Sequence, residues 1–155
     1  MATTQPTAEQ WKAIEADVMR LFHPVYLDCD GYLVRLMLER VGKLRLGIVV
    51  HVDSRLDPAW LGLGEDGPTE IGERFFQERT MSVYRGKQKR LAKRVMGKKE
   101  SEKKISHRHP WWESTTSMRR HLVANNDAIR LLEDEEVTQR HEALKAQRAA
   151  KQVAS

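Results

Sequence analysis

Four apolar side chains near the start of the chain recur three or four positions apart: Trp11, Ile14, Val18 and Leu21. This spacing places them on one face of a helix. Thr7 and Gln10 precede the stripe at the spacing of a capping box, in which each side chain binds the backbone amide of the other residue. Pro24, which cannot continue a helix, follows closely. The pattern therefore predicts a helix over residues 8–22 with its apolar face on the core.

From residue 25 onward, apolar positions alternate with polar ones, which is typical of strands with one buried face. The alternating runs cover residues 25–29, 32–39 and 44–52. Asp30-Gly31 joins the first two runs and favours a type I′ hairpin turn, because both central residues of that turn need a positive φ. We expect a three-stranded antiparallel meander packed under the first helix, and residues 59–61 are a candidate for a fourth strand.

The middle of the chain has weaker patterns. Glycines and a proline dominate residues 62–68, which we interpret as a loop; its Gly-x-Gly lacks the Lys-Ser/Thr pair of a phosphate-binding P-loop. Residues 69–79 have a helical pattern that turns Ile71 and one of Phe75 and Phe76 inward. Residues 98–104 are too polar to pack, so they predict a mobile loop.

The last third returns to regular patterns. A helix with Met118 and Leu122 on its apolar face is followed by an apolar run over residues 128–132 that predicts a closing strand. From Glu133 the composition changes to acidic residues and then to Lys, Arg, Gln and Ala, which indicates a charged helical or disordered tail over residues 133–155.

Together these elements predict one α+β domain over residues 1–132. We expect its N-terminal helix to pack on an antiparallel sheet of three or four strands, followed by a basic helix and a further helix.

The positive charge of the chain is concentrated in residues 81–109, which hold eleven Lys or Arg and two Glu. Residues 1–80 hold nine basic and thirteen acidic side chains, and residues 110–155 hold seven of each. Between Gly86 and Gly97 we predict a helix with a narrow apolar seam formed by Tyr84, Gln88, Leu91 and Val95. Its basic residues occupy the remaining circumference, and they lack the interleaved carboxylates that would neutralise them through i,i+4 pairs.

A fixed array of positive charge favours binding to DNA, RNA or a nucleoprotein complex. Arg119 and Arg120 begin the next helix and are expected to enlarge the array. Of Trp111 and Trp112, we expect one indole in the core and the other exposed enough to stack on a base or anchor a partner. The candidate binding residues are Lys87, Lys89, Arg90, Lys93, Arg94, Arg108, Trp112, Arg119 and Arg120. The alternatives are a solvated charged face and a wholly structural role for both indoles.

The sequence offers little support for catalysis or cofactor chemistry. Cys29, the only cysteine, lies between two aspartates that raise its pKa, and its strand position indicates a small buried hydrophobe. His107 and His109 are spaced as two metal ligands, but no third ligand stands at a recognised spacing, so we expect no metal. We therefore predict a non-enzymatic protein without catalytic residues or a cofactor. The exception is a metal-dependent nuclease, which would need the carboxylates of Asp28, Asp30 and Asp53 beside the basic helix.

A cytoplasmic location is the expectation from the same features. A lone cysteine allows no disulfide within the chain, and the first residues lack the cationic start and apolar middle of a signal peptide. No apolar run approaches the roughly eighteen residues of a membrane span, so we expect no membrane contact.

Several segments, in their order, resemble a group of small uncharacterised proteins of bacteriophages and prophages: residues 8–15, Asp30-Gly31-Tyr32, the basic helix, Pro110-Trp111-Trp112, and residues 117–126. The likeness covers residues 8–132. It implies a phage accessory protein in the cytoplasm of a bacterial host, where such proteins commonly act on nucleic-acid machinery or block defences. Our first hypothesis is therefore a nucleic-acid-binding or nucleoprotein-binding accessory protein. The alternative is a protein-binding inhibitor of a host defence protein, and a third hypothesis is a self-associating structural or assembly protein.

Overall fold

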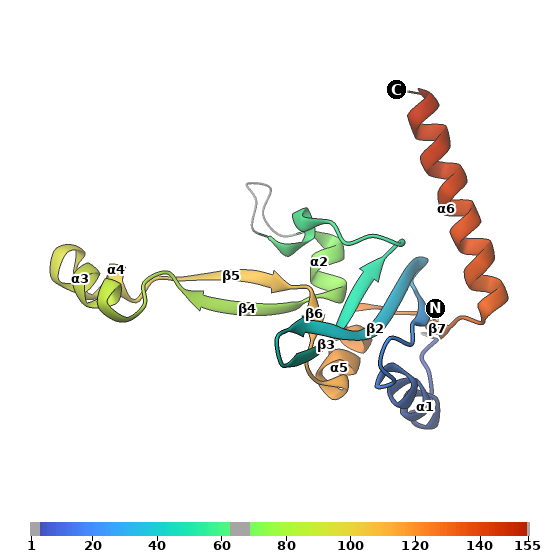
Figure 1. Cartoon of the computed structure of the whole chain (residues 1–155), viewed down its shortest axis with the longest axis horizontal. Helices are drawn as coiled ribbons and strands as arrows, with labels where there is room; N and C mark the ends of the chain where they lie inside the picture. The colour runs from blue at the N-terminus through green and yellow to red at the C-terminus, as the bar shows by residue number, and fades with distance from the viewer. Residues whose placement is uncertain (1–3, 63–68, 155) are drawn as a thin grey trace.

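The computed structural model describes residues 4–62 and 69–154 and has the predicted α+β architecture (Figure 1). A five-stranded antiparallel sheet forms the body, and a second, two-stranded sheet projects from it as an arm. The helices are α1 (Ala8–Val18), α2 (Glu70–Phe75), α3 (Gly86–Met96), α4 (Lys98–Ser101), α5 (Thr115–Asn125) and α6 (Asp134–Ala154). The strands are β1 (Val25–Cys29), β2 (Tyr32–Gly42), β3 (Arg45–Val52), β4 (Gln77–Ser82), β5 (Lys104–His109), β6 (Trp111–Trp112) and β7 (Ile129–Leu131).

Helix α1 confirms the helix predicted at the start of the chain. Both hydrogen bonds of the capping box between Thr7 and Gln10 are present. The helix ends at Val18, four residues before the predicted end at residue 22. Phe22 has a φ of 58°, so the chain has already left the helical conformation when it reaches Pro24. Leu21, the last residue of the predicted stripe, is consequently exposed rather than part of the core.

The five-stranded sheet has the order β6-β3-β2-β1-β7. Its centre is the predicted meander, and the φ values of Asp30 (51°) and Gly31 (94°) fit the predicted type I′ turn. The predicted closing strand is present as β7, which pairs with β1. The short strand β6 adds an edge beside β3 that the sequence did not indicate.

The core lies between one face of this sheet and helices α1, α2 and α5. The alternating apolar residues of β1, β2 and β3 are buried on that face, as the period of two predicts. Met118 and Leu122 of α5 are fully buried, and both Phe75 and Phe76 are buried although the sequence assigned only one of them to the core. Burial, followed by the charges of Asp28 and Asp30, raises the pKa of Cys29 to about 12, so the thiol is an inert core group at neutral pH.

In the segment before the arm, one predicted element is wrong and another is shorter than predicted. Residues 59–61 form part of a 3-10 helix, Pro58–Leu61, rather than a fourth strand. Asp57 caps this helix and Pro58 fixes φ in its first turn, which favours a helical turn over an extended strand. The helix predicted over residues 69–79 ends at Phe75, and the chain continues as β4. Residues 63–68 of the predicted loop lie outside the described residues.

The arm is an antiparallel ribbon of β4 and β5 that carries α3 and α4 at its far end (Figure 1). Its register runs from Gln77 opposite His109, next to the body, to Ser82 opposite Lys104, next to the two helices. The mobile loop predicted over residues 98–104 is wrong for its first half, which forms α4. A hydrogen bond of 2.7 Å from Ser101 Oγ to the Lys98 carbonyl closes that turn.

Helix α6 begins where the predicted tail begins and covers part of the outer face of the sheet. Val137 and Leu144 pack with Leu33 and Leu132 in a small second cluster. Arg140 of α6 forms a 2.6 Å ion pair with Asp28 in β1. The far end of α6 projects away from the body (Figure 1). In the described part of the chain, no helix combines the length and the apolar character that crossing a membrane requires.

Candidate nucleic-acid interface

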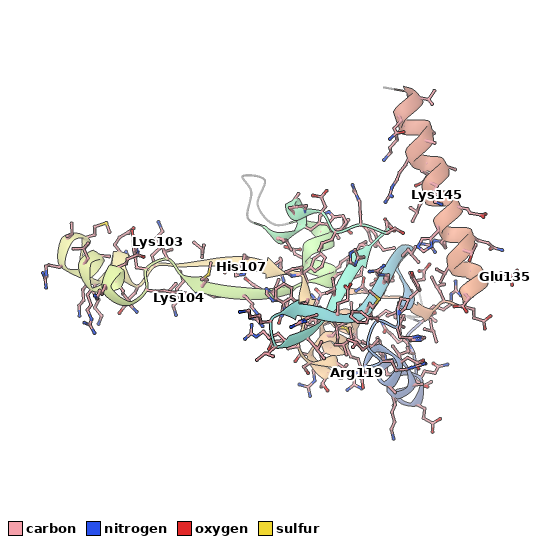
Figure 2. All side chains as sticks on the ribbon, viewed as in Figure 1. Lys103, Lys104, His107, Arg119, Glu135 and Lys145 are labelled. Atoms are coloured by element: carbon pink, nitrogen blue, oxygen red, sulfur yellow. The ribbon has the colours of Figure 1, made fainter. Side chains whose placement is uncertain are left out.

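The far end of the arm carries most of the basic residues that the sequence analysis singled out. We call residues 83–104 the arm tip; a 3.0 Å hydrogen bond from the Val83 amide to the Lys103 carbonyl closes its base. Ten Lys or Arg and two Glu lie within it, and all ten basic residues are exposed: Arg85, Lys87, Lys89, Arg90, Lys93, Arg94, Lys98, Lys99, Lys103 and Lys104. Lys103 and Lys104 mark the junction of the tip with the ribbon in Figure 2.

Helix α3 supplies five of these basic residues, the same five that the sequence predicted: Lys87, Lys89, Arg90, Lys93 and Arg94. Among the described residues, none of the five forms an ion pair. The one ion pair found within the described tip joins Lys103 Nζ to Glu100 Oε1 at 3.8 Å. Both side chains are largely exposed, so this pair contributes little. The positive charge of the tip is therefore displayed to solvent rather than neutralised by the acidic half of the chain.

The apolar seam of α3 exists, but it does not face the core. Leu91 is 61% exposed and Val95 is 72% exposed, because α3 lies at the end of the arm, away from the body. The side chains of the seam line a shallow groove: Val83, Tyr84, Gln88, Leu91, Ala92, Val95 and Met96. The tip consequently combines a basic surface with an uncovered apolar groove.

Arg108, Arg119 and Arg120 do not extend this surface, so that part of the prediction is wrong. Arg108 lies in β5 and donates a 3.2 Å hydrogen bond to the Phe76 carbonyl. Arg119 and Arg120 lie on α5, which packs against the body, and Figure 2 shows Arg119 there. Arg119 forms an ion pair of 3.4 Å with Glu15. The physical reason is that β5 leads the chain back along the arm before α5 begins.

Trp112 also falls outside the interface. Its side chain is 4% exposed and belongs to the core, where its indole Nε1 donates a 3.1 Å hydrogen bond to the Phe75 carbonyl. A buried indole cannot stack on a base, so the assignment of Trp112 to the binding surface is wrong. Trp111, the half-buried one of the pair, packs on His109 with ring centroids 3.9 Å apart.

The three aspartates of the nuclease hypothesis lie at turns of the sheet and not beside α3. Asp28 accepts from the Gly31 amide and pairs with Arg140. Asp53 accepts a 3.0 Å hydrogen bond from the Leu33 amide. In the part of the chain that the structure describes, no group of three or more His, Cys, Asp or Glu side chains is arranged to hold a metal ion.

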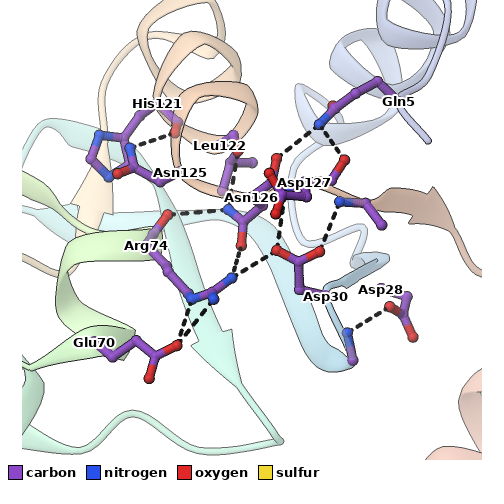
Figure 3. Close-up of polar contacts among 12 residues, drawn as sticks. Gln5, Asp28, Asp30, Glu70, Arg74, His121, Leu122, Asn125, Asn126 and Asp127 are labelled. Carbon is purple, nitrogen blue, oxygen red and sulfur yellow. Dashed lines mark hydrogen bonds and ion pairs between the residues drawn. The ribbon is translucent and has the colours of Figure 1, made fainter. Parts of the chain in front are cut away.

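Asp30 belongs to a polar network that the sequence did not reveal (Figure 3). Its carboxylate accepts hydrogen bonds of 2.9 and 2.8 Å from the amides of Asp127 and Ala128 and forms a 2.8 Å ion pair with Arg74. Arg74 also contacts Asn126, the C-cap residue that follows α5. Burial raises the pKa of Asp30, but the two amides and the Arg74 guanidinium lower it by more, so the net shift is downward. The network joins the β1–β2 turn to α2 and to the end of α5.

His107 and His109 share one face of β5, with ring centroids 6.5 Å apart. Burial and the nearby Arg79 lower the pKa of His109, which keeps its imidazole neutral at neutral pH. The arm around these two histidines is basic, and this positive charge disfavours the binding of a metal cation between them.

Comparisons with protein-family models, with curated proteins and with solved structures find no match for this chain.

Proposed function

We propose that this protein binds DNA, RNA or a nucleoprotein complex through its arm tip, as a non-enzymatic accessory protein of a phage or prophage in the cytoplasm of its host. The observation that carries the proposal is the exposure of ten basic side chains on the tip, with one weak ion pair among the described residues there. A surface of this kind attracts a polyanion because contact with phosphates releases condensed counterions.

The position of the charge supports this proposal as much as its amount. The ribbon of β4 and β5 holds α3 away from the body, so the tip reaches a phosphate backbone without a clash from the sheet (Figure 1). The five basic residues of α3 lie on one short helix, which holds them in a fixed array. Contacts between these cations and phosphates carry no sequence information, so we expect binding that depends weakly on base sequence.

Salt dependence is the first test of this proposal. If the five basic residues of α3 contact phosphates, the slope of log K against log salt concentration should be about −4.5 for duplex DNA and about −3.5 for a single strand. Fluorescence polarisation of labelled 20-mers between 50 and 200 mM salt measures both slopes. A slope shallower than about −1 for both nucleic acids would show that phosphate contacts do not drive binding.

A second candidate function, inhibition of a host defence protein, is favoured by the groove on α3. Leu91, Val95 and Met96 are each at least half exposed, and together they form an apolar strip bordered by basic residues. Apolar strips on helices are common docking sites for amphipathic segments of other proteins. The basic border here suits an acidic segment.

A pull-down from nuclease-treated host lysate distinguishes the two functions. If the protein binds nucleic acid, we expect the pull-down to recover no stoichiometric protein partner. The double variant Leu91→Gln and Val95→Gln should then bind nucleic acid with an affinity within about twofold of the wild type, because these substitutions leave every charge in place. Recovery of a stoichiometric protein by the wild type and its loss in this variant would instead establish the inhibitor. The exposed positions of both residues make a folding defect unexpected.

A further inference from the structure

A small cavity lies on the outer face of the five-stranded sheet, opposite the core. Its volume is about 90 Å³, and it is lined by Tyr26, Leu33, Arg35, His51, Ser54 and His141. Since one water molecule needs about 10–15 Å³ of cavity space, this volume holds several waters. The cavity therefore accommodates one small polyatomic ion but not a nucleoside.

Three polar side chains form a row across the floor of this cavity. Tyr26 in β1 is directly opposite Arg35 in β2, and Arg35 is directly opposite His51 in β3. Directly opposed residues of antiparallel strands have Cβ atoms about 5 Å apart. The phenol, guanidinium and imidazole groups consequently stand side by side on the same face.

Helix α6 and the turn after β3 complete the cavity. The imidazole of His141 meets the ring of Tyr26 edge-on, with centroids 5.6 Å apart. Arg148 of α6 donates a 2.8 Å hydrogen bond to the Asp53 carbonyl, which ties the helix to the turn that contains Ser54. The tail predicted from the sequence thus contributes one wall of the cavity.

The electrostatics of the cavity favour an anion. Each polar side chain that lines it has a hydrogen-bond donor, and no carboxylate lines it. Within the described residues, the side chain of Arg35 forms no ion pair or hydrogen bond, and its Nε is buried without a partner, as is Nδ1 of His51. A half-buried guanidinium without a counter-charge is unfavourable, and an oxyanion bound beside it would satisfy both the charge and the donors.

We propose that this cavity binds one tetrahedral oxyanion of the phosphate type, with Arg35 as its main charged contact and His51, Tyr26 and Ser54 as further donors. The site is separate from the arm tip and does not depend on the function proposed for the tip. Free inorganic phosphate and the terminal phosphate of a nucleotide share this chemistry, and the experiment distinguishes these two sources.

The test uses the full-length protein and inorganic phosphate, with sodium chloride at equal ionic strength as the reference. We expect phosphate to raise Tm saturably beyond the effect of the salt, because a ligand that binds the folded state stabilises it. Two-dimensional ¹H–¹⁵N spectra should show the largest shifts at the amides of Tyr26, His51 and Ser54. The same shifts with adenosine monophosphate would assign the site to a terminal phosphate, whereas shifts with inorganic phosphate alone would assign it to the free ion.

Arg35→Gln should weaken phosphate binding at least about tenfold, since it removes the charge and the paired N–H donors. Arg45→Gln is the matched control: Arg45 lies in β3, is exposed and does not line the cavity, so its variant should bind as the wild type does. Equal binding by Arg35→Gln and the wild type, or shifts confined to the arm tip, would overturn the proposal. If Arg35→Gln does not fold, the location of the shifts in the wild type decides the question.

Discussion

Reversing Lys89, Arg90, Lys93 and Arg94 to Glu should reduce the affinity for DNA and RNA by at least about a hundredfold. Each substitution removes a cation that would displace a counterion from a phosphate, and it adds a carboxylate that repels the phosphate backbone. The four substitutions lower the formal net charge from +5 to −3. All four side chains are exposed on the arm tip, and none of them forms an ion pair in the described part of the chain, so the fold should be unaffected. Fluorescence polarisation measures the affinity, and far-ultraviolet circular dichroism verifies the fold.

The matched control changes the net charge by the same amount as the tip variant but leaves the arm tip intact. It reverses four exposed basic residues of the body and of α6: Lys12, Arg20, Lys43 and Lys145. We expect this control to weaken binding much less than the tip variant, because binding depends on where the charge lies. Equal reductions in the two variants would mean that only the net charge of the protein attracts nucleic acid, and unchanged binding by the tip variant would refute the assignment of α3.

Asp30→Ala should lower the free energy of unfolding by about 1–2 kcal/mol, because it leaves the Asp127 and Ala128 amides and the Arg74 guanidinium without their shared acceptor. The side chain of Asp30 is only 20% exposed, so water replaces these hydrogen bonds incompletely. Urea denaturation followed by fluorescence of the four tryptophans measures the difference.

Asp30→Asn separates the effect of charge from that of conformation. Asn tolerates the φ of 51° at this turn and retains one acceptor oxygen, so this variant should lose about half as much stability as Asp30→Ala. A decrease of less than about 0.5 kcal/mol in Asp30→Ala would show that the network does not stabilise the fold.

The effect of Asp30→Ala should also depend on pH. The net shift in the pKa of Asp30 is downward from the ordinary value of 3.8, so the carboxylate contributes its full stability above that value. The contribution is lost as the pH falls through the lower pKa of the folded state. The difference between wild type and Asp30→Ala should therefore be constant near neutral pH and should shrink below pH 3.8.

One part of the candidate interface, the basic helix α3, could be predicted from the sequence. The five basic residues of α3, its seam and its bounding glycines are all features of one short segment, and the structure places them on one exposed helix as the sequence indicated. The assignment of Arg119 and Arg120 to the same surface failed because it relied on proximity in sequence. The ribbon of β4 and β5 separates the two helices in space, and pairing between strands about twenty residues apart leaves no local signal.

The sequence by itself determined the elements whose signals are local. The capping box of α1, the turn at Asp30-Gly31 and the alternation in β1 to β3 each depend on residues a few positions apart, so hydrogen bonding and solvation within the segment define them. Only the tertiary structure decided which apolar residues are covered: Trp112 enters the core, whereas Leu91 and Val95 stay exposed at the end of the arm. Tertiary structure also brought Arg35 and His51 under α6 and joined Asp30 to Arg74. Burial and polar networks arise from contacts between distant segments, and a pattern along the chain specifies which side of an element is apolar but not what packs against it.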